Sequence, residues 1–117
     1  MLRKFQLGFH VTATLSAGVD IKFTVPSDCQ LLHCSAVASN NSDATLQLGT
    51  SAAAEAYLAS CVIGDSGVPV ESSKADFVGG EYPHIVAGTV FDIALDHDGD
   101  AGIAANDFTI VLTFSEG

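Results

Sequence analysis

Strict alternation of apolar and polar residues between Phe5 and Leu15 constrains the fold more than any other feature of this sequence. Every odd position in the segment is Phe, Leu, Val or Ala, and every even position is Gln, Gly, His or Thr. In an extended chain this period of two puts the apolar side chains on one face, whereas a helix would distribute them around its axis. The segment therefore predicts a β-strand with one buried face and one solvent-facing face.

Other segments predict strands from the same pattern and from the residues that interrupt it. Pro26 ends the second alternating run, because proline cannot donate a hydrogen bond to a neighbouring strand. The further predicted strands are residues 21–25, 29–38, 44–50, 89–96 and 108–114. The alternation in residues 29–38 is weaker, which predicts a strand covered on both faces. Many short strands separated by turns predict an all-β fold, an antiparallel β-sandwich of jelly-roll-like type.

The middle of the chain has no clear period. Residues 39–43 are rich in Asn and Ser and predict a turn. Residues 52–60 are rich in alanine and predict at most one short helix. Residues 64–88 are rich in Gly, Ser, Pro and acids, and predict long loops that carry binding or oligomer contacts. With no internal repeat and no linker, residues 1–117 are predicted to form a single domain.

The charge of the chain limits its partners. The net charge is −10, with only four Lys and Arg residues, so nucleic acid and anionic membrane surfaces are not expected partners. Arg3 and Lys4 supply two of these four cations. They predict that residues 1–4 form a docking arm for an acidic surface, the alternative being a solubilising end. A mean hydropathy of +0.37 predicts apolar surface covered by a partner or by other copies.

The cysteines and the N-terminal residues bear on the compartment. Three cysteines cannot all pair within one chain, which favours a reducing compartment and buried thiols. The alternation after residue 5 interrupts any apolar core of a signal peptide, and no run approaches the length of a transmembrane helix. We expect a protein made in the cytoplasm without a cleaved leader.

The sequence GDSGVP at residues 64–69 resembles the motif around the nucleophilic serine of chymotrypsin-like proteases, and His33 precedes a cysteine as their catalytic histidine does. A catalytic triad needs a base within hydrogen-bond reach of the serine and an acid that orients the base. Here Val68 replaces the glycine that keeps the oxyanion hole open, and His33 lies in a predicted strand. We interpret Ser66 as a turn residue and do not expect an enzyme.

Four acidic residues near the C-terminus have the spacing of a calcium-binding loop. Asp96, Asp98, Asp100 and Asp107 occupy positions 1, 3, 5 and 12 of such a loop. However, position 6 is Ala101 instead of glycine, and position 12 is Asp instead of the bidentate Glu. A solvated connection between strands is the favoured interpretation and a non-helical calcium site is the alternative. No other cofactor is expected.

Most of the chain resembles small all-β structural proteins of tailed bacteriophages. The residues that carry the resemblance are the FTVP end of the second strand, LGTS, AGTVFDIAL and the final strand NDFTIVLTFSEG. The resemblance implies a capsid decoration (cement) protein that stabilises the shell as a homotrimer on the capsid exterior, with the major capsid protein as partner. It implies no catalytic residues.

The candidate capsid-docking residues are Arg3 and Lys4, which would meet an acidic shell, and Phe5 and Leu7, which would anchor the contact. The alternative function is a ligand-binding β-sandwich, a calcium-assisted carbohydrate-binding module. Its site would combine the acidic loop with the loops of residues 64–88.

Overall fold

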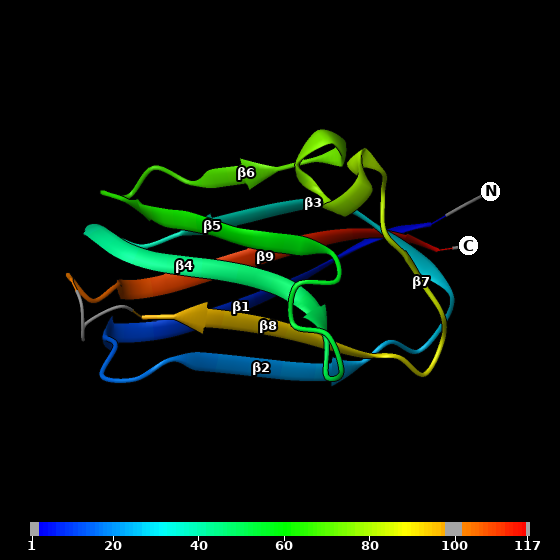
Figure 1. The fold of residues 1–117 in the computed structure, drawn as a ribbon, viewed down its shortest axis with the longest axis horizontal. Coiled ribbons are helices and arrows are strands. Elements are labelled where there is room, and N and C mark those ends of the chain that lie inside the picture. Colours follow the sequence, from blue (N-terminus) through cyan, green and yellow to red (C-terminus); the bar gives the residue numbers. More distant parts are fainter. Residues whose placement is uncertain (1–2, 98–101, 117) are drawn as a thin grey trace.

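A computed structural model describes residues 3–97 and 102–116 as two antiparallel β-sheets that face each other (Figure 1). The first sheet has the order β1 (Lys4–Thr14), β9 (Asn106–Glu116), β3 (Cys29–Val37) and β6 (Val70–Ser72), and β7 (His84–Ile85) pairs with β3. The second sheet has the order β2 (Val19–Thr24), β8 (Val90–Asp96), β4 (Asn41–Thr50) and β5 (Leu58–Asp65). The predicted all-β antiparallel sandwich is confirmed.

The chain crosses repeatedly between the two sheets, although β4 and β5 stay in the second sheet and β6 and β7 in the first. β1 and β2 lie in different sheets, and they pair with β9 and β8, the last two strands of the chain. β3 and β4 then continue the first and second sheets from β9 and β8. The two ends of the sequence therefore lie side by side, and the order is jelly-roll-like.

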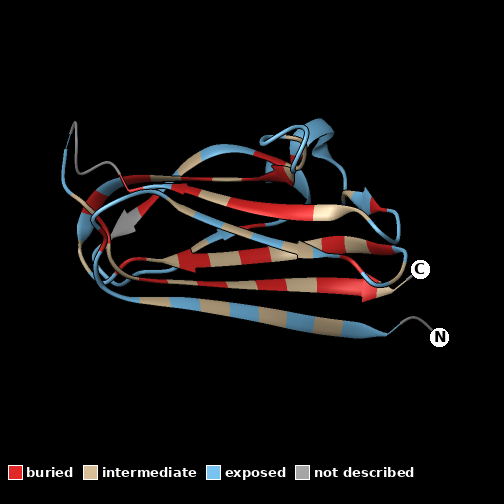
Figure 2. Ribbon diagram, turned by 90° about the horizontal axis from the view of Figure 1, so that it is seen from below, coloured by how far each residue is buried: buried red, intermediate tan, exposed pale blue. Residues whose placement is uncertain are grey.

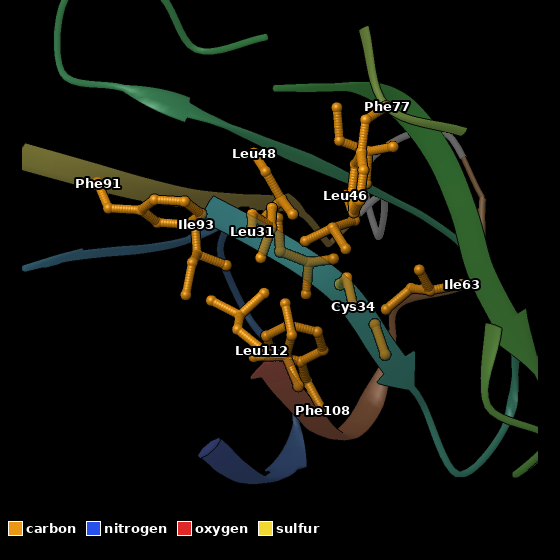
Figure 3. Close-up of a cluster of buried hydrophobic side chains, with 14 of the residues drawn as sticks. Leu31, Cys34, Leu46, Leu48, Ile63, Phe77, Phe91, Ile93, Phe108 and Leu112 are labelled. Carbon is orange, nitrogen blue, oxygen red and sulfur yellow. The ribbon is translucent and has the colours of Figure 1, made fainter. Parts of the chain in front are cut away.

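The core lies between the sheets and follows the alternation in the sequence. In β9, the side chains of Phe108, Ile110, Leu112 and Phe114 are all buried, as predicted. Figure 3 shows part of this cluster, with Phe91 of β8 at one end. The Phe91 ring stacks on the ring of Phe23 in β2 at 5.2 Å and meets Phe114 edge-on at 5.7 Å. Aromatic contacts thus connect three strands from both sheets.

A bulge explains the weak alternation of β3. Leu31 lies opposite Phe114 and His33 lies opposite Thr113, so Leu32 is an extra residue in the ladder. The buried positions change from odd to even across this residue: Leu31 is buried before it and Cys34 after it. Because the outer residues of β3 are only half-buried, the bulge, and not burial on both faces, disturbs the pattern.

The prediction of a short helix near residues 52–60 is wrong. Residues 51–57 form turns and bends, and β5 begins at Leu58. The N–H of Tyr57 donates to the carbonyl of Leu48 at 2.9 Å, and the N–H of Thr50 donates to Ala53 at 2.9 Å. A Cβ at Gly49 would collide with the backbone of Ala53. The loop therefore folds back onto β4, and these contacts override the helix propensity of its alanines.

The predicted turn and the predicted long loops are both shorter than expected. β4 begins at Asn41, within the segment 39–43 that predicted a turn. The segment 64–88 contains β6, β7 and two 3₁₀ turns, η1 (Lys74–Asp76) and η2 (Val78–Gly80). Phe77, between these turns, is buried against the core. No described helix is long and apolar enough to cross a membrane.

We expect Phe91→Ala to lower the free energy of unfolding by about 3–5 kcal/mol, because it removes a fully buried ring and leaves a cavity. Chemical denaturation measures this loss. The control is Val62→Ala on β5, where the side chain is 59% exposed and the change should stay within about 0.5 kcal/mol. Equal losses in the two variants would contradict the placement of Phe91 at the centre of the core.

Candidate interaction surfaces

Within residues 3–97 and 102–116 the surface has no pocket. The same residues contain no group of three or more His, Cys, Asp or Glu side chains arranged to hold a metal ion.

The serine and histidine of the protease-like motif lie in a turn and in a strand. Ser66 has a φ of 50° and Gly67 a φ of 82°, and they turn the chain between β5 and β6. The N–H of Ser66 donates to the carbonyl of Asn40 at 3.1 Å. His33 lies in β3, where its Nε2 is 3.2 Å from the Glu71 carboxylate of β6. The prediction of a turn at Ser66 is confirmed.

The acidic residues of the candidate calcium loop are only partly described. Asp98 and Asp100 lie outside the described residues, and Asp96 is exposed at the end of β8. Asp107 lies in β9, where Oδ1 accepts the N–H of Ala13 at 2.7 Å and Oδ2 accepts the hydroxyl of Ser39 at 3.1 Å. Asp107 thus holds the irregular end of β1, a role that the spacing of the acids did not indicate. Calcium binding stays a prediction.

Three of the candidate docking residues belong to β1, and Arg3 directly precedes it. Lys4 is the first residue of the strand and lies opposite Ser115, and the carbonyl of Arg3 accepts the N–H of Glu116 at 2.7 Å. Both cationic residues are exposed. Phe5 stacks on Phe114 at 5.1 Å, and Leu7 also packs against the core. In the described part of the predicted arm, Lys4 is therefore strand and Arg3 directly precedes it, and the two apolar anchors pack against the core.

The two long edges of the sandwich differ in how well they are covered. At one edge, Phe77 is buried beside β5 and β6, and the N–H of Val78 donates to the carbonyl of Tyr57 at 2.9 Å. The other edge is formed by β1 and β2, and neither strand contains a buried residue (Figure 2). We call it the open edge. Its half-buried apolar residues are Phe5, Leu7, Phe9, Val11, Val19, Ile21 and Phe23.

A charged cluster lies on the outer face of the second sheet. The ammonium of Lys22 in β2 pairs with the Asp20 carboxylate and lies 3.8 Å from Oδ1 of Asp92 in β8. Asp92 is buried, and this burial raises the pKa of its carboxyl, with the neighbouring Asp20 adding to the effect. Hydrogen bonding to Asp92 and Lys22 lowers the pKa of Asp20.

All three cysteines have free thiols, and two of them lie in the core. Cys29 and Cys34 are buried in β3, whereas Cys61 in β5 is half-buried. Burial, reinforced by the nearby Cys61, raises the pKa of Cys34 to about 12. The Cys34 thiol is therefore protonated and unreactive at neutral pH. The predicted buried thiols are confirmed for Cys29 and Cys34.

No known family model and no curated protein matches the chain. Among solved structures, it is similar to a chain of the cyanophage Pam1 capsid asymmetric unit, with a TM-score of 0.58 and 13% sequence identity. The similarity covers 99% of this chain and 85% of that chain. At this identity it establishes a common fold, which extends over the whole sandwich.

We expect Asp92→Asn to raise the melting temperature by a few degrees at pH 7. When the pKa of a carboxyl is higher in the folded than in the unfolded state, the free energy of unfolding falls as the pH rises from the ordinary pKa through the folded value. The neutral amide of asparagine has no such cost. The gain should therefore be larger at pH 7 than near pH 4. Thermal unfolding at both pH values measures this gain in melting temperature. The control is Glu81→Gln, which removes a carboxylate from an exposed residue. A gain that does not depend on pH would contradict the assigned cause.

Proposed function

We propose that this chain is a virion structural protein, a decoration (cement) protein that binds the outer surface of a tailed-phage capsid as a homo-oligomer. One observation carries the proposal: the fold similarity to a chain of a phage capsid asymmetric unit extends over 99% of this sequence. That chain is only slightly longer, since 85% of it is covered. The proposal also rests on the resemblance of the strand segments to phage structural proteins.

The charge of the chain favours the capsid exterior. With a net charge of −10, the protein is repelled by packaged nucleic acid inside a shell. Arg3 and Lys4 are exposed at one end of β1, where they are available to an acidic surface. The partner is then the major capsid protein, and the contact stabilises the shell by joining neighbouring subunits.

The composition of purified particles tests the proposal. If the chain is a decoration protein, mass spectrometry of particles from its source should find it in a fixed ratio to the major capsid protein. Particles stripped of it should break at a lower temperature. Absence from the particles would refute the proposal. Calorimetric binding of calcium together with a glycan would then support the carbohydrate-binding alternative.

We expect Lys4→Glu to weaken capsid binding about five- to thirty-fold, because reversing one contact charge costs about 1–2 kcal/mol. Rebinding of purified protein to stripped particles, followed by sedimentation, measures the loss. Lys74→Glu on η1 is the matched control, since Lys74 is exposed and lies far along the chain from the predicted docking residues. Equal binding by the two variants would show that Lys4 does not belong to the docking surface.

A further inference from the structure

The segment of β1 from Lys4 to Thr12 is less protected than the other edge strands against pairing with another chain. Proteins usually protect sheet edges with short strands, charges, prolines or bulges, because an edge offers unpaired backbone groups. β6 has three residues, follows Pro69 and contains Glu71. β2 contains Asp20 and Lys22, and β5 has two register shifts against β4. β1 has eleven residues and, after Lys4, contains neither a charge nor a proline.

The backbone groups of alternate residues in β1 point to the open edge. The N–H of Glu116 donates to the carbonyl of Arg3. These two residues are therefore a bonded pair, one position before the pair of Lys4 and Ser115. In an antiparallel ladder bonded and non-bonded pairs alternate, so the odd residues of β1 bond to β9. The N–H and C=O groups of the even residues, from Lys4 to Thr12, face away from β9 and can bond to a further strand.

The regular part of β1 is symmetric about Gly8. The strand becomes irregular after Val11, and Ala13 has a φ of 68°, so the segment from Lys4 to Thr12 has Gly8 at its midpoint. The inward apolar residues are Phe5 and Leu7 before this midpoint and Phe9 and Val11 after it. The sequence pattern is thus the same in both directions. A strand of this kind is complementary to an antiparallel copy of itself.

Nothing within one chain requires a glycine at position 8. Its φ lies outside the left-handed region, and a Cβ there would meet only the carbonyl of Ile110 and Cγ2 of Val111, both at an ordinary contact distance of 3.8 Å. Glycine weakens the interior of a strand and often marks the close approach of another backbone. Gly8 lies where a two-fold axis would bring two backbones together.

Charge favours a second copy of this chain as the occupant. Two proteins of net charge −10 repel each other, but residues 1–19 contain no Asp or Glu. Antiparallel pairing about Gly8 places Arg3 opposite Ala13 of the partner subunit. In each chain the N–H of Ala13 is held by the Asp107 carboxylate. The cationic end of one β1 therefore meets the end of the other β1 that carries a carboxylate.

We infer that β1 pairs antiparallel with β1 of a second copy about a two-fold axis at Gly8. The first sheets of the two copies join into one continuous sheet, with about ten new backbone hydrogen bonds between the even residues. Phe5 then faces Val11 of the partner subunit and Leu7 faces Phe9 of the partner subunit, which covers the half-buried residues of β1. The pairing gives the homo-oligomer of the proposed function a definite form. The biological role of the pairing rests on that proposed function. The pairing replaces the trimer that the sequence resemblance implies.

Light scattering on the purified protein tests the pairing. The expected mass is twice 12.0 kDa. Gly8→Asp should raise the dissociation constant of the pair at least about tenfold, because it places two carboxylates opposite each other at the axis. Gly8→Ala is the matched control, since it adds the same Cβ without charge, and it should weaken the pair much less than Gly8→Asp. Circular dichroism and the melting temperature should show that both variants fold.

A cysteine placed at the axis tests the register independently of stability. In a bonded antiparallel pair the two Cα atoms are about 5.5 Å apart, within the range of a disulfide. Mild oxidation of Gly8→Cys should therefore give a covalent dimer on a non-reducing gel. Thr12→Cys should not, because the two residues 12 would be about 27 Å apart, eight residues along the strands.

The outcomes separate the pairing from the proposed function. A wild-type mass of one or three chains, a Gly8→Asp variant that stays paired, or cross-linking at position 12 instead of 8 would overturn the pairing. A trimer found in purified particles would overturn it and leave the proposed function standing. A Gly8-centred dimer that is absent from particles would support the pairing and refute the proposed function.

Discussion

The stacking of aromatic rings around Phe91 is the interaction on which the rest of the structure depends. Phe91 belongs to the second sheet, and its ring contacts Phe23 of β2, Tyr57 and Phe114 of the first sheet. Phe5 of β1 stacks on one of these rings, that of Phe114. Because both N-terminal strands are held through these rings, the position of the open edge follows from the packing at the centre of the core.

The sandwich has one covered edge and one open edge, and this asymmetry determines where it can meet a partner. Phe77 and the two 3₁₀ turns cover the edge at β5 and β6, whereas β1 and β2 contain no buried residue. The described surface has no pocket. The open edge is therefore the part of the described surface on which the proposed pairing through β1 is based.

The surroundings of the candidate site residues were less predictable than the fold, because they depend on neighbours distant in sequence. The spacing of Asp96 and Asp107 suggested a shared ligand, but the Asp107 carboxylate binds Ala13 and Ser39. Phe5 and Leu7 were expected to anchor a docking arm, and the structure shows them half-buried against the core. Spacing along the chain cannot indicate which strand lies beside a residue, so neither role could be found from the sequence.

The alternation of residue types by itself determined the strands β1, β8 and β9, their inward faces and the all-β class, because a period of two is compatible only with extended chain. The midpoint of the regular part of β1 at Gly8, in contrast, follows from the structure, because the strand becomes irregular after Val11. Only the tertiary structure decided that residues 52–57 lie on β4 instead of forming a helix, that β3 bulges at Leu32, and that β1 lies at an edge. Local propensity is worth less than about 1 kcal/mol per residue, whereas strand order depends on long-range hydrogen bonds and burial that no local pattern encodes.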